Sequence, residues 1–273
     1  LFTSKRTAHN TTRLKDRLYV NLNYRFKDST VSNSPKPGYK YMEPGLYMFP
    51  AYQDTIRSCI LHSPLNPKKE YAYSDLGFIL LKFAVEHVTE KSLDQYCQEE
   101  FYRKLGMHHT DFLAHKRLNK NNLVPSCVDK LYRKTELKGY VHDPVAALLG
   151  GIAGHAGLFS TAEDLAKMMQ LYLNGGTYGG EYYFSPETMV TFSCKNNLFP
   201  KNRRGLGFDK PEPDQTKINP VSKCLPLTSF GHTGFTGIMA WCDPDNKLLY
   251  LFLSNRTYPD EFNTKLSEMN IRT

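Results

Sequence analysis

Residues 71–88, YAYSDLGFILLKFAVEHV, give the first strong helix signal in the chain. The apolar residues follow the i, i+3, i+4, i+7 spacing of a single helical face: Leu76, Ile79, Leu80 and Phe83. Further apolar side chains widen this stripe: Phe78, Leu81 and Val85. We therefore expect a helix over residues 75–88 that the rest of the protein covers on most sides, with Ser74 or Asp75 capping its N-terminus.

Three further helices are expected, over residues 52–61, 93–102 and 162–174. The last of them has a clear start, because Ser160 and Glu163 have the spacing of a capping box. Gly175 and Gly176 follow its last residues and end it. The helix over residues 93–102 precedes Gly106, which suits the left-handed position after a helix C-terminus.

The last third of the chain predicts β-structure. Residues 237–242 and 248–254 flank the turn sequence DPDN, which favours an antiparallel hairpin, and a short helix is expected over residues 263–271. Residues 1 to about 45 predict irregular structure, and residues 113–140 predict an exposed polar excursion. Because helices precede a late hairpin without regular alternation of strands and helices, the predicted fold class is α+β, an antiparallel sheet flanked by helices.

The basic charge of the chain is spread along its length. Its 273 residues hold 35 Lys and Arg against 27 Asp and Glu, a net charge of +8, with small clusters at Lys68-Lys69 and residues 201–204. A nucleic-acid-binding domain shows one basic stripe on a recognisable module, and neither is present. We therefore interpret both clusters as solvated surface and expect no nucleic-acid partner.

Cysteine spacing and hydropathy exclude several other classes of protein. The six cysteines are too scattered for a zinc or redox motif, so we expect free thiols packed mostly as small hydrophobes, no metal and no other cofactor. The longest apolar run has six residues, whereas a transmembrane helix needs about 20. The chain begins with Leu1 and shows no signal-peptide pattern. These features predict a processed product or a fragment of a longer protein.

Three short motifs contain residues that could carry chemistry. Tyr73-Ser74-Asp75 opens the predicted helix, residues 150–161 (GGIAGHAGLFST) hold four glycines within eight residues, and His232-Thr233-Gly234 leads into the hairpin. Each also has a structural interpretation: a helix cap, a tight turn with His155 as a buried hydrogen-bonding group, and a glycine-rich strand start. The glycine segment is no phosphate-binding loop, because the Gly-Lys-Ser/Thr ending is absent.

In this order, the motifs resemble the serine β-lactamase and penicillin-binding-protein superfamily, in the branch of class C β-lactamases, D-alanyl-D-alanine carboxypeptidases and related esterases. Tyr73-Ser74-Asp75 is similar to its Tyr-x-Asn motif, and His232-Thr233-Gly234 to its Lys/His-Thr-Gly motif. The resemblance is close to exported Bacteroidetes-type members. It implies a β-lactamase/transpeptidase-like hydrolase domain over residues 65–273, with residues 1–64 as an irregular N-terminal segment of the same domain.

One essential part of this family's machinery is absent, because no Ser-x-x-Lys occurs in the 273 residues. In the family this motif precedes the tyrosine motif and puts the nucleophile beside the lysine that helps take its proton. Thr12 and Lys15 have the spacing but lie in a polar stretch, and Thr135 and Lys138 follow the tyrosine motif, so we reject both pairs. We interpret the motif as lying on a missing upstream segment, whose loss leaves the fold incomplete at its N-terminal side. Without that segment, the sheet would have an unpaired edge, and the apolar face of the helix over residues 75–88 would be exposed.

The resemblance also assigns roles to residues of this chain. Tyr73 would relay a proton as general base, and Thr233 would hydrogen-bond the substrate. The backbone N–H of Phe235, next to Gly234, would supply half of the oxyanion hole. The complete protein would be an exported serine hydrolase that transfers acyl groups from an amide or ester, with a small-molecule or peptidoglycan-like substrate. This chain without its nucleophile would be inactive.

Two positions depart from the family's pattern. Asp75 stands where the family usually has Asn, and an ionised carboxylate cannot donate a hydrogen bond to a substrate carbonyl. His232 replaces the commoner lysine and is mostly neutral at pH 7. Both changes favour an esterase or an unusual D-amino-acid peptidase over a penicillinase. The alternative function is a non-catalytic binding module that keeps the cleft of a dead hydrolase, and an upstream Ser-x-x-Lys would distinguish the two.

Overall fold

The computed structural model describes residues 2–3, 11–15, 18–21, 25–68, 70–197, 199 and 202–272. The elements of the N-terminal part are β1 (Phe2–Thr3), β2 (Thr11–Lys15), β3 (Leu18–Asn21), β4 (Arg25–Phe26), β5 (Val31–Ser32), β6 (Lys40–Glu43), β7 (Leu46–Met48) and α1 (Tyr52–Leu61). Strands β1 and β4 pair, and so do β2 and β3, both antiparallel. Helix α1 has the bounds that the sequence predicts.

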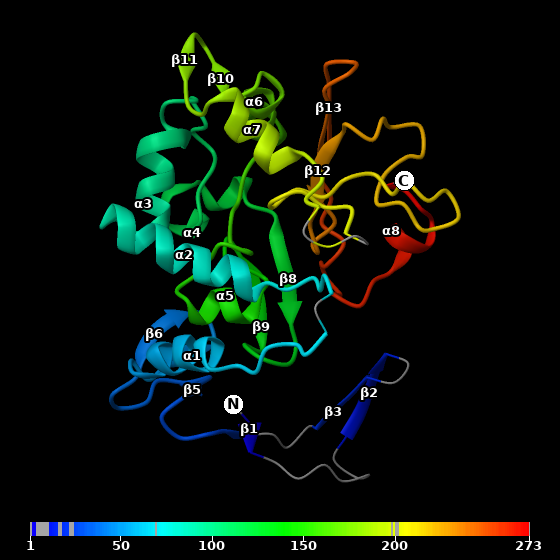
Figure 1. Ribbon diagram of the computed structural model, residues 1–273. Helices are drawn as coiled ribbons and strands as arrows, with labels where there is room; N and C mark the ends of the chain where they lie inside the picture. The colour runs from blue at the N-terminus through cyan, green and yellow to red at the C-terminus, as the bar shows by residue number, and fades with distance from the viewer. Residues whose placement is uncertain are drawn as a thin grey trace.

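A small antiparallel sheet of order β5-β7-β6 lies beside α1 (Figure 1). Val31, Leu46 and Met48 are buried in it. The prediction of irregular structure over residues 1 to about 45 is therefore wrong for the strands β1 to β6, whereas residues 33–39 form a loop. Strands of two to four residues are too short to show a period of two, and their burial depends on contacts with distant parts of the chain.

The middle of the chain contributes most of the helices. They are α2 (Leu76–Thr89), α3 (Leu93–Cys97) with a π-helical continuation at Gln98–Tyr102, α4 (Ala114–Arg117), a 3₁₀ turn at Lys120–Asn122 and α5 (Pro144–Leu148). Helix α2 confirms the helix predicted over residues 75–88, and α3 with its π-helical continuation confirms the one predicted over residues 93–102. Gly106 has a φ of +66°, the left-handed conformation expected after that helix. Figure 1 shows α2 and α3 stacked on one side of the molecule.

Helix α2 is much less covered than its wide apolar stripe predicts. Only Ile79 and Lys82 are buried among its residues, whereas Leu76, Phe78 and Leu81 are exposed. The prediction of cover on most sides is therefore wrong. One side of α2 packs on the core, and the other presents apolar side chains to solvent.

The prediction of an exposed excursion over residues 113–140 is only partly right, because residues 119–122 are exposed but much of the remainder is not. They contain an antiparallel hairpin of β8 (Pro125–Asp129) and β9 (Thr135–Lys138), in which Cys127 and Leu137 are fully buried. Arg133, at the turn, is also buried, and its guanidinium lies 2.6 Å from a Glu43 carboxylate oxygen and 2.7 Å from one of Asp129. Arg133 and Asp129 can be buried because they pair with each other and Arg133 also pairs with Glu43, which composition does not reveal.

The C-terminal part forms the main sheet and its covering helix. Its elements are α6 (Ala162–Leu173), β10 (Thr177–Tyr178), β11 (Glu181–Tyr182), α7 (Pro186–Ser193), β12 (Phe230–Thr233), β13 (Met239–Asp243), β14 (Leu248–Phe252) and α8 (Lys265–Glu268). The sheet is antiparallel with the order β12-β13-β14, which confirms the predicted hairpin. Helix α6 packs against β13 and β14 around Met169, Phe230 and Cys242. Helix α8 is a single turn and shorter than expected.

Helix α6 begins at Ala162 as predicted, but its cap is Thr161 in place of Ser160, since the Thr161 side chain accepts a hydrogen bond from the Asp164 N–H. All six cysteines are free thiols. Cys59, Cys194 and Cys224 are exposed, so the expectation that the thiols pack mostly as small hydrophobes is wrong for these three. No helix in the described part of the chain is both long and apolar enough to cross a membrane.

The glycine-rich segment packs closely against α2, and Gly154 is its tightest point. A Cβ at Gly154 would lie 2.2 Å from the Phe78 carbonyl oxygen. We expect Gly154→Ala to lower the free energy of unfolding by about 1–3 kcal/mol, since the backbone of α2 would have to move. Gly77→Ala is the control, because nothing lies within 4 Å of a Cβ there and alanine favours a helix by about 0.5–1 kcal/mol. Equal effects in urea unfolding would contradict this close contact.

Candidate active site

Tyr73, His232 and the start of α2 lie together although they are far apart in sequence. Tyr73 directly precedes α2 and is 61% exposed, and its ring centroid lies 6.3 Å from that of His232 on β12. The Ser74 hydroxyl accepts a hydrogen bond from the Leu76 N–H at 3.2 Å, so Ser74 caps the start of α2 and Asp75 does not. Folding thus brings the first and third sequence motifs side by side.

Arg204 lies between these two motifs. Its guanidinium carbon is 5.0 Å from the Tyr73 ring centroid, and Nη1 is 2.8 Å from Nε2 of His232. Nη2 donates to Asp209 Oδ2 at 2.9 Å, and Arg203 donates to the same oxygen at 2.9 Å. The interpretation of residues 201–204 as solvated surface is therefore wrong for Arg203 and Arg204. No local spacing signals this cluster, because His232 comes from another element.

Burial and neighbouring charges keep both aromatic groups neutral near pH 7. Burial lowers the pKa of His232, the hydrogen bond with the Thr233 carbonyl opposes this, and the charge of Arg204 lowers it further. Partial burial raises the pKa of Tyr73, and so does the Asp75 carboxylate, while Arg204 acts against both. The environment of Tyr73 therefore disfavours the phenolate near pH 7.

The turn after β12 carries the Phe235 N–H that the resemblance assigns to the oxyanion hole. The Gly234 N–H donates to the Ile238 carbonyl at 2.7 Å, and the Gly234 carbonyl accepts from the Gly237 N–H at 3.1 Å and from Arg272 at 3.3 Å. Within the described residues, no hydrogen bond occupies the Phe235 N–H. Hydrogen bonds to the Gly234 carbonyl thus hold the turn in place, and the Phe235 N–H stays available as a backbone donor.

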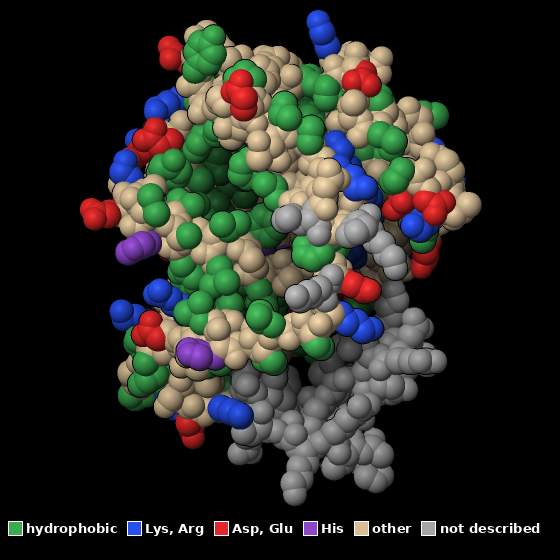
Figure 2. Space-filling model, in the orientation of Figure 1, with side chains coloured by type: hydrophobic (Ala, Val, Ile, Leu, Met, Phe, Trp, Pro, Cys, Tyr) green, Lys and Arg blue, Asp and Glu red, His purple; other side chains and the backbone are tan. Residues whose placement is uncertain are grey.

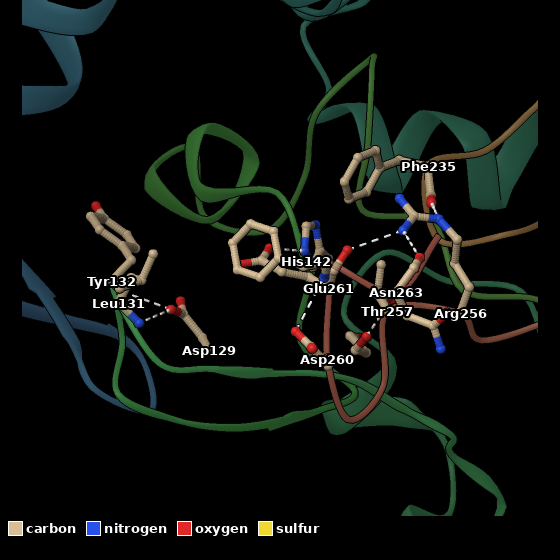
Figure 3. Close-up of polar contacts among 12 residues, drawn as sticks. Asp129, Leu131, Tyr132, His142, Phe235, Arg256, Thr257, Asp260, Glu261 and Asn263 are labelled. Carbon is tan, nitrogen blue, oxygen red and sulfur yellow. Dashed lines mark hydrogen bonds and ion pairs between the residues drawn. The ribbon is translucent and has the colours of Figure 1, made fainter. Parts of the chain in front are cut away.

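Arg256 braces the same turn from the C-terminal loop (Figure 3). Its Nε donates to the Phe235 carbonyl at 2.7 Å, and its guanidinium carbon lies 4.3 Å from the Phe235 ring centroid. Its Nη1 donates to the carbonyls of Glu261 and Asn263. The His142 ring lies 5.1 Å from that of Phe235 and bonds the Glu261 carboxylate at 2.9 Å. The sequence analysis did not single out Arg256, because its contact with the Phe235 carbonyl joins residues that are far apart in sequence and gives no motif.

Asp75 lies on a different side of the tyrosine segment. It lines a cavity of about 450 Å³ with Ser74 and Leu76, facing residues of α1 and His155. In the described chain, no hydrogen bond joins Asp75 to His232 or Thr233. The structure therefore brings Tyr73 to His232, whereas Asp75 lines the cavity next to α1.

His155 is a buried hydrogen-bonding group, which confirms its structural interpretation. Its side chain is 4% exposed, and Nε2 lies 2.9 Å from Oδ1 of Asp143, the residue that caps α5. Burial raises the pKa of Asp143, but hydrogen bonds from His155 and the Ala146 N–H outweigh it, and the pKa is lowered overall. This hydrogen bond links the glycine segment to the start of α5. Among the described residues, no cluster of three or more His, Cys, Asp or Glu side chains could hold a metal ion.

The β-lactamase family model matches residues 33–269 of this chain. The chain belongs to the β-lactamase family. This match starts at residue 33, within the predicted N-terminal segment. The resemblance argued from the three motifs begins only at residue 65. The division of the chain at residue 64 stays a prediction.

Curated relatives of this β-lactamase-family chain are described as putative D-alanyl-D-alanine carboxypeptidases. The protein of Escherichia coli K12 is 36% identical over 215 residues, which cover 73% of this chain and 48% of that protein. The protein of Salmonella gallinarum is 31% identical over 242 residues, which cover 81% of this chain and 54% of the relative. The chain thus spans about half the length of the curated relatives it matches.

A solved structure supports the fold independently. The crystal structure of a penicillin-binding-protein homologue from Caulobacter crescentus aligns with a TM-score of 0.54 at 17% identity, covering 75% of this chain and 58% of that one. The predicted α+β fold of the β-lactamase and penicillin-binding-protein type is therefore confirmed.

Proposed function

We propose that this chain is the C-terminal part of a serine hydrolase that transfers acyl groups from an amide or ester. The observation that carries the proposal is the position of Tyr73 beside His232. Thr233 follows His232 on β12, and the Phe235 N–H is available on the turn after that strand. A general base, a substrate-binding hydroxyl and an oxyanion donor are what acyl transfer needs apart from the nucleophile. The roles of Tyr73, Asp75, His232, Thr233, Gly234 and Phe235 remain part of this proposal.

We infer that the nucleophile comes from a Ser-x-x-Lys segment upstream of residue 1. The chain has no such motif, and it spans about half the length of its relatives. Figure 2 shows hydrophobic side chains gathered around a hollow over α2. Leu76, Phe78 and Leu81 of α2 are exposed, as are Val190 and Phe192 of α7. Apolar surface of this extent favours cover by a further segment of polypeptide.

The substrate class follows from the relatives and from two residues of this chain. The relatives' descriptions name D-alanyl-D-alanine carboxypeptidases, which favours a peptidoglycan-like peptide or a small ester as substrate and an exported, cell-envelope location. Asp75 cannot donate to a substrate carbonyl as an amide does, and His232 is neutral. Both features favour an esterase or D-amino-acid peptidase over a penicillinase.

Turnover by the isolated and the completed protein tests this proposal. The 273-residue chain alone is expected to hydrolyse neither nitrocefin, nor p-nitrophenyl esters, nor a D-Ala-D-Ala peptide, since it lacks a nucleophile. The chain produced with its upstream polypeptide is expected to hydrolyse the ester or the peptide. The upstream Ser→Ala variant is the control. Serine-dependent turnover by the isolated chain would contradict the inference of an upstream nucleophile.

The same two samples test whether the upstream polypeptide covers α2. We expect the isolated chain to self-associate in light scattering, and its melting temperature to rise when the upstream polypeptide is added. A compact monomer whose melting temperature does not change would show that the exposed face of α2 needs no partner.

The absence of Ser-x-x-Lys favours a second candidate, a non-catalytic module that keeps the cleft of a dead hydrolase. This function predicts that the full-length protein also lacks the motif and binds a D-Ala-D-Ala peptide without cleaving it. Calorimetry with the completed protein distinguishes binding without turnover from catalysis.

A further inference from the structure

Arg204 has no assigned role, yet it contacts both aromatic groups of the candidate site. The side chain is 17% exposed, and its guanidinium lies against the face of the Tyr73 ring. Two of its nitrogens are used, Nη1 toward His232 Nε2 at 2.8 Å and Nη2 toward Asp209 Oδ2 at 2.9 Å. Asp209, itself buried, pairs with Gly231 of β12 through two backbone hydrogen bonds. The guanidinium is therefore fixed to the strand that carries His232.

The hydrogen bonds of His232 determine where its proton lies. A guanidinium only donates, so Nε2 must accept the hydrogen bond from Arg204 and carries no proton. The other ring nitrogen, Nδ1, lies 2.8 Å from the Thr233 carbonyl oxygen, which only accepts, so Nδ1 must carry the proton. Both contacts are satisfied together only by neutral imidazole protonated at Nδ1.

We propose that Arg204 is the positioning residue of this site: it holds His232 as the neutral Nδ1–H tautomer and itself supplies the positive charge beside Tyr73. The proposal deepens the proposed function, on which it rests. In the family the corresponding motif position is usually a lysine, whose charge faces the substrate. Here the imidazole can neither donate from Nε2 nor carry charge while Arg204 is in place. The positive charge of the site therefore lies on the 203–209 loop and not on residue 232.

The charged groups around His232 agree with this assignment. The 203–209 loop presents Arg203, Arg204 and Asp209, and the α2 side presents Tyr73. Asp209 is shared by the two arginines and does not contact the imidazole in the described structure. The charge of Arg204 also lowers the pKa of Tyr73, against the effects of burial and Asp75. One arginine thus acts on the proton positions of both groups.

Nitrogen NMR of the histidine side chains tests the proposal in the 273-residue chain, without any need for turnover. Long-range ¹H–¹⁵N spectra across a pH titration report which ring nitrogen carries the proton. Assignment of the signal comes from the His232→Gln variant. We expect His232 to show the Nδ1–H pattern at neutral pH and to protonate only below its ordinary pKa of 6.5.

Arg204→Met and Arg203→Met form a matched pair of variants. Both remove an arginine that binds Asp209, but only Arg204 contacts His232. We expect Arg204→Met to give a mixture of tautomers and a higher His232 pKa, and Arg203→Met to keep the Nδ1–H pattern. An Nε2–H pattern in the unmodified chain would overturn the proposal even if Arg204→Met failed to fold. Equal changes in the two variants would also overturn it.

Turnover by the completed protein gives a second measurement that separates this proposal from the proposed function. Arg204→Met is expected to lower kcat and to move the alkaline rise of the pH–rate profile to higher pH, and Arg204→Lys to restore part of that shift. An unchanged profile in an active enzyme would contradict the role of Arg204 alone. A completed protein without turnover would contradict the proposed function and leave the tautomer result standing.

Discussion

Replacing Tyr73 by phenylalanine is expected to lower kcat of the completed hydrolase by about 10²–10⁴-fold, the usual contribution of a general base. The ring of Tyr73 lies beside His232 and under Arg204, so the variant keeps these contacts and loses only the hydroxyl. KM is expected to change little, because a proton relay acts in the transition state more than in substrate binding.

Tyr71→Phe is the matched control for this variant. Tyr71 is exposed, lies two residues earlier on the same segment and has no role in the proposed site. Its loss of a hydroxyl is expected to leave kcat within about twofold, as for surface substitutions away from a site. Equal losses of kcat in Tyr73→Phe and Tyr71→Phe would contradict the general-base role of Tyr73.

The pH dependence of the same enzyme follows from the environment of Tyr73. Burial and the Asp75 carboxylate raise its pKa, so the phenolate that accepts a proton forms only as the pH increases. We expect kcat/KM of the unmodified enzyme to rise with pH on its alkaline side, and this rise to be absent in Tyr73→Phe. A profile that keeps the rise in Tyr73→Phe would assign it to another group.

Replacing Arg133 by methionine is expected to lower the free energy of unfolding by about 3–5 kcal/mol, the cost of removing one partner from a buried ion pair. Arg133 is 2% exposed and bonds Glu43 of β6 and Asp129 of β8. It also donates to the carbonyls of Val141 and His142 at 2.8 and 2.6 Å. The variant leaves two buried carboxylates and two carbonyls without this donor.

Lys36→Met is the control for Arg133→Met, and urea unfolding is the measurement. Lys36 pairs with Asp28 at 2.9 Å, but both side chains are exposed, so the loss is expected to stay below about 1 kcal/mol.

Burial already raises the pKa of Glu43 despite Arg133. Without the arginine, the destabilisation should shrink as the pH falls, because the carboxylates become protonated and lose their buried charge. A similar loss in both variants would contradict the structural role of Arg133.

The strongest patterns in the sequence were those that depend on near neighbours. The apolar spacing of α2 and α6, Gly106, and the turn between β13 and β14 all predict their elements correctly. Their physical basis is local, since capping hydrogen bonds, helical periodicity and turn conformations involve residues a few positions apart. The motifs of Tyr73 and His232 indicated the β-lactamase family for the same reason, because each motif is a short contiguous stretch.

Other features depend on residues that lie far apart in sequence. The burial of Arg133 between Glu43 and Asp129 contradicts the polar appearance of residues 113–140, and Arg204 meets Tyr73 and His232 from a loop that resembles solvated surface. A charged side chain can be buried once a partner from another element cancels the cost of leaving water. The resemblance of short motifs indicated the family and local spacing indicated the elements of this protein, whereas tertiary structure alone decided which charges are paired and where the site's positive charge lies.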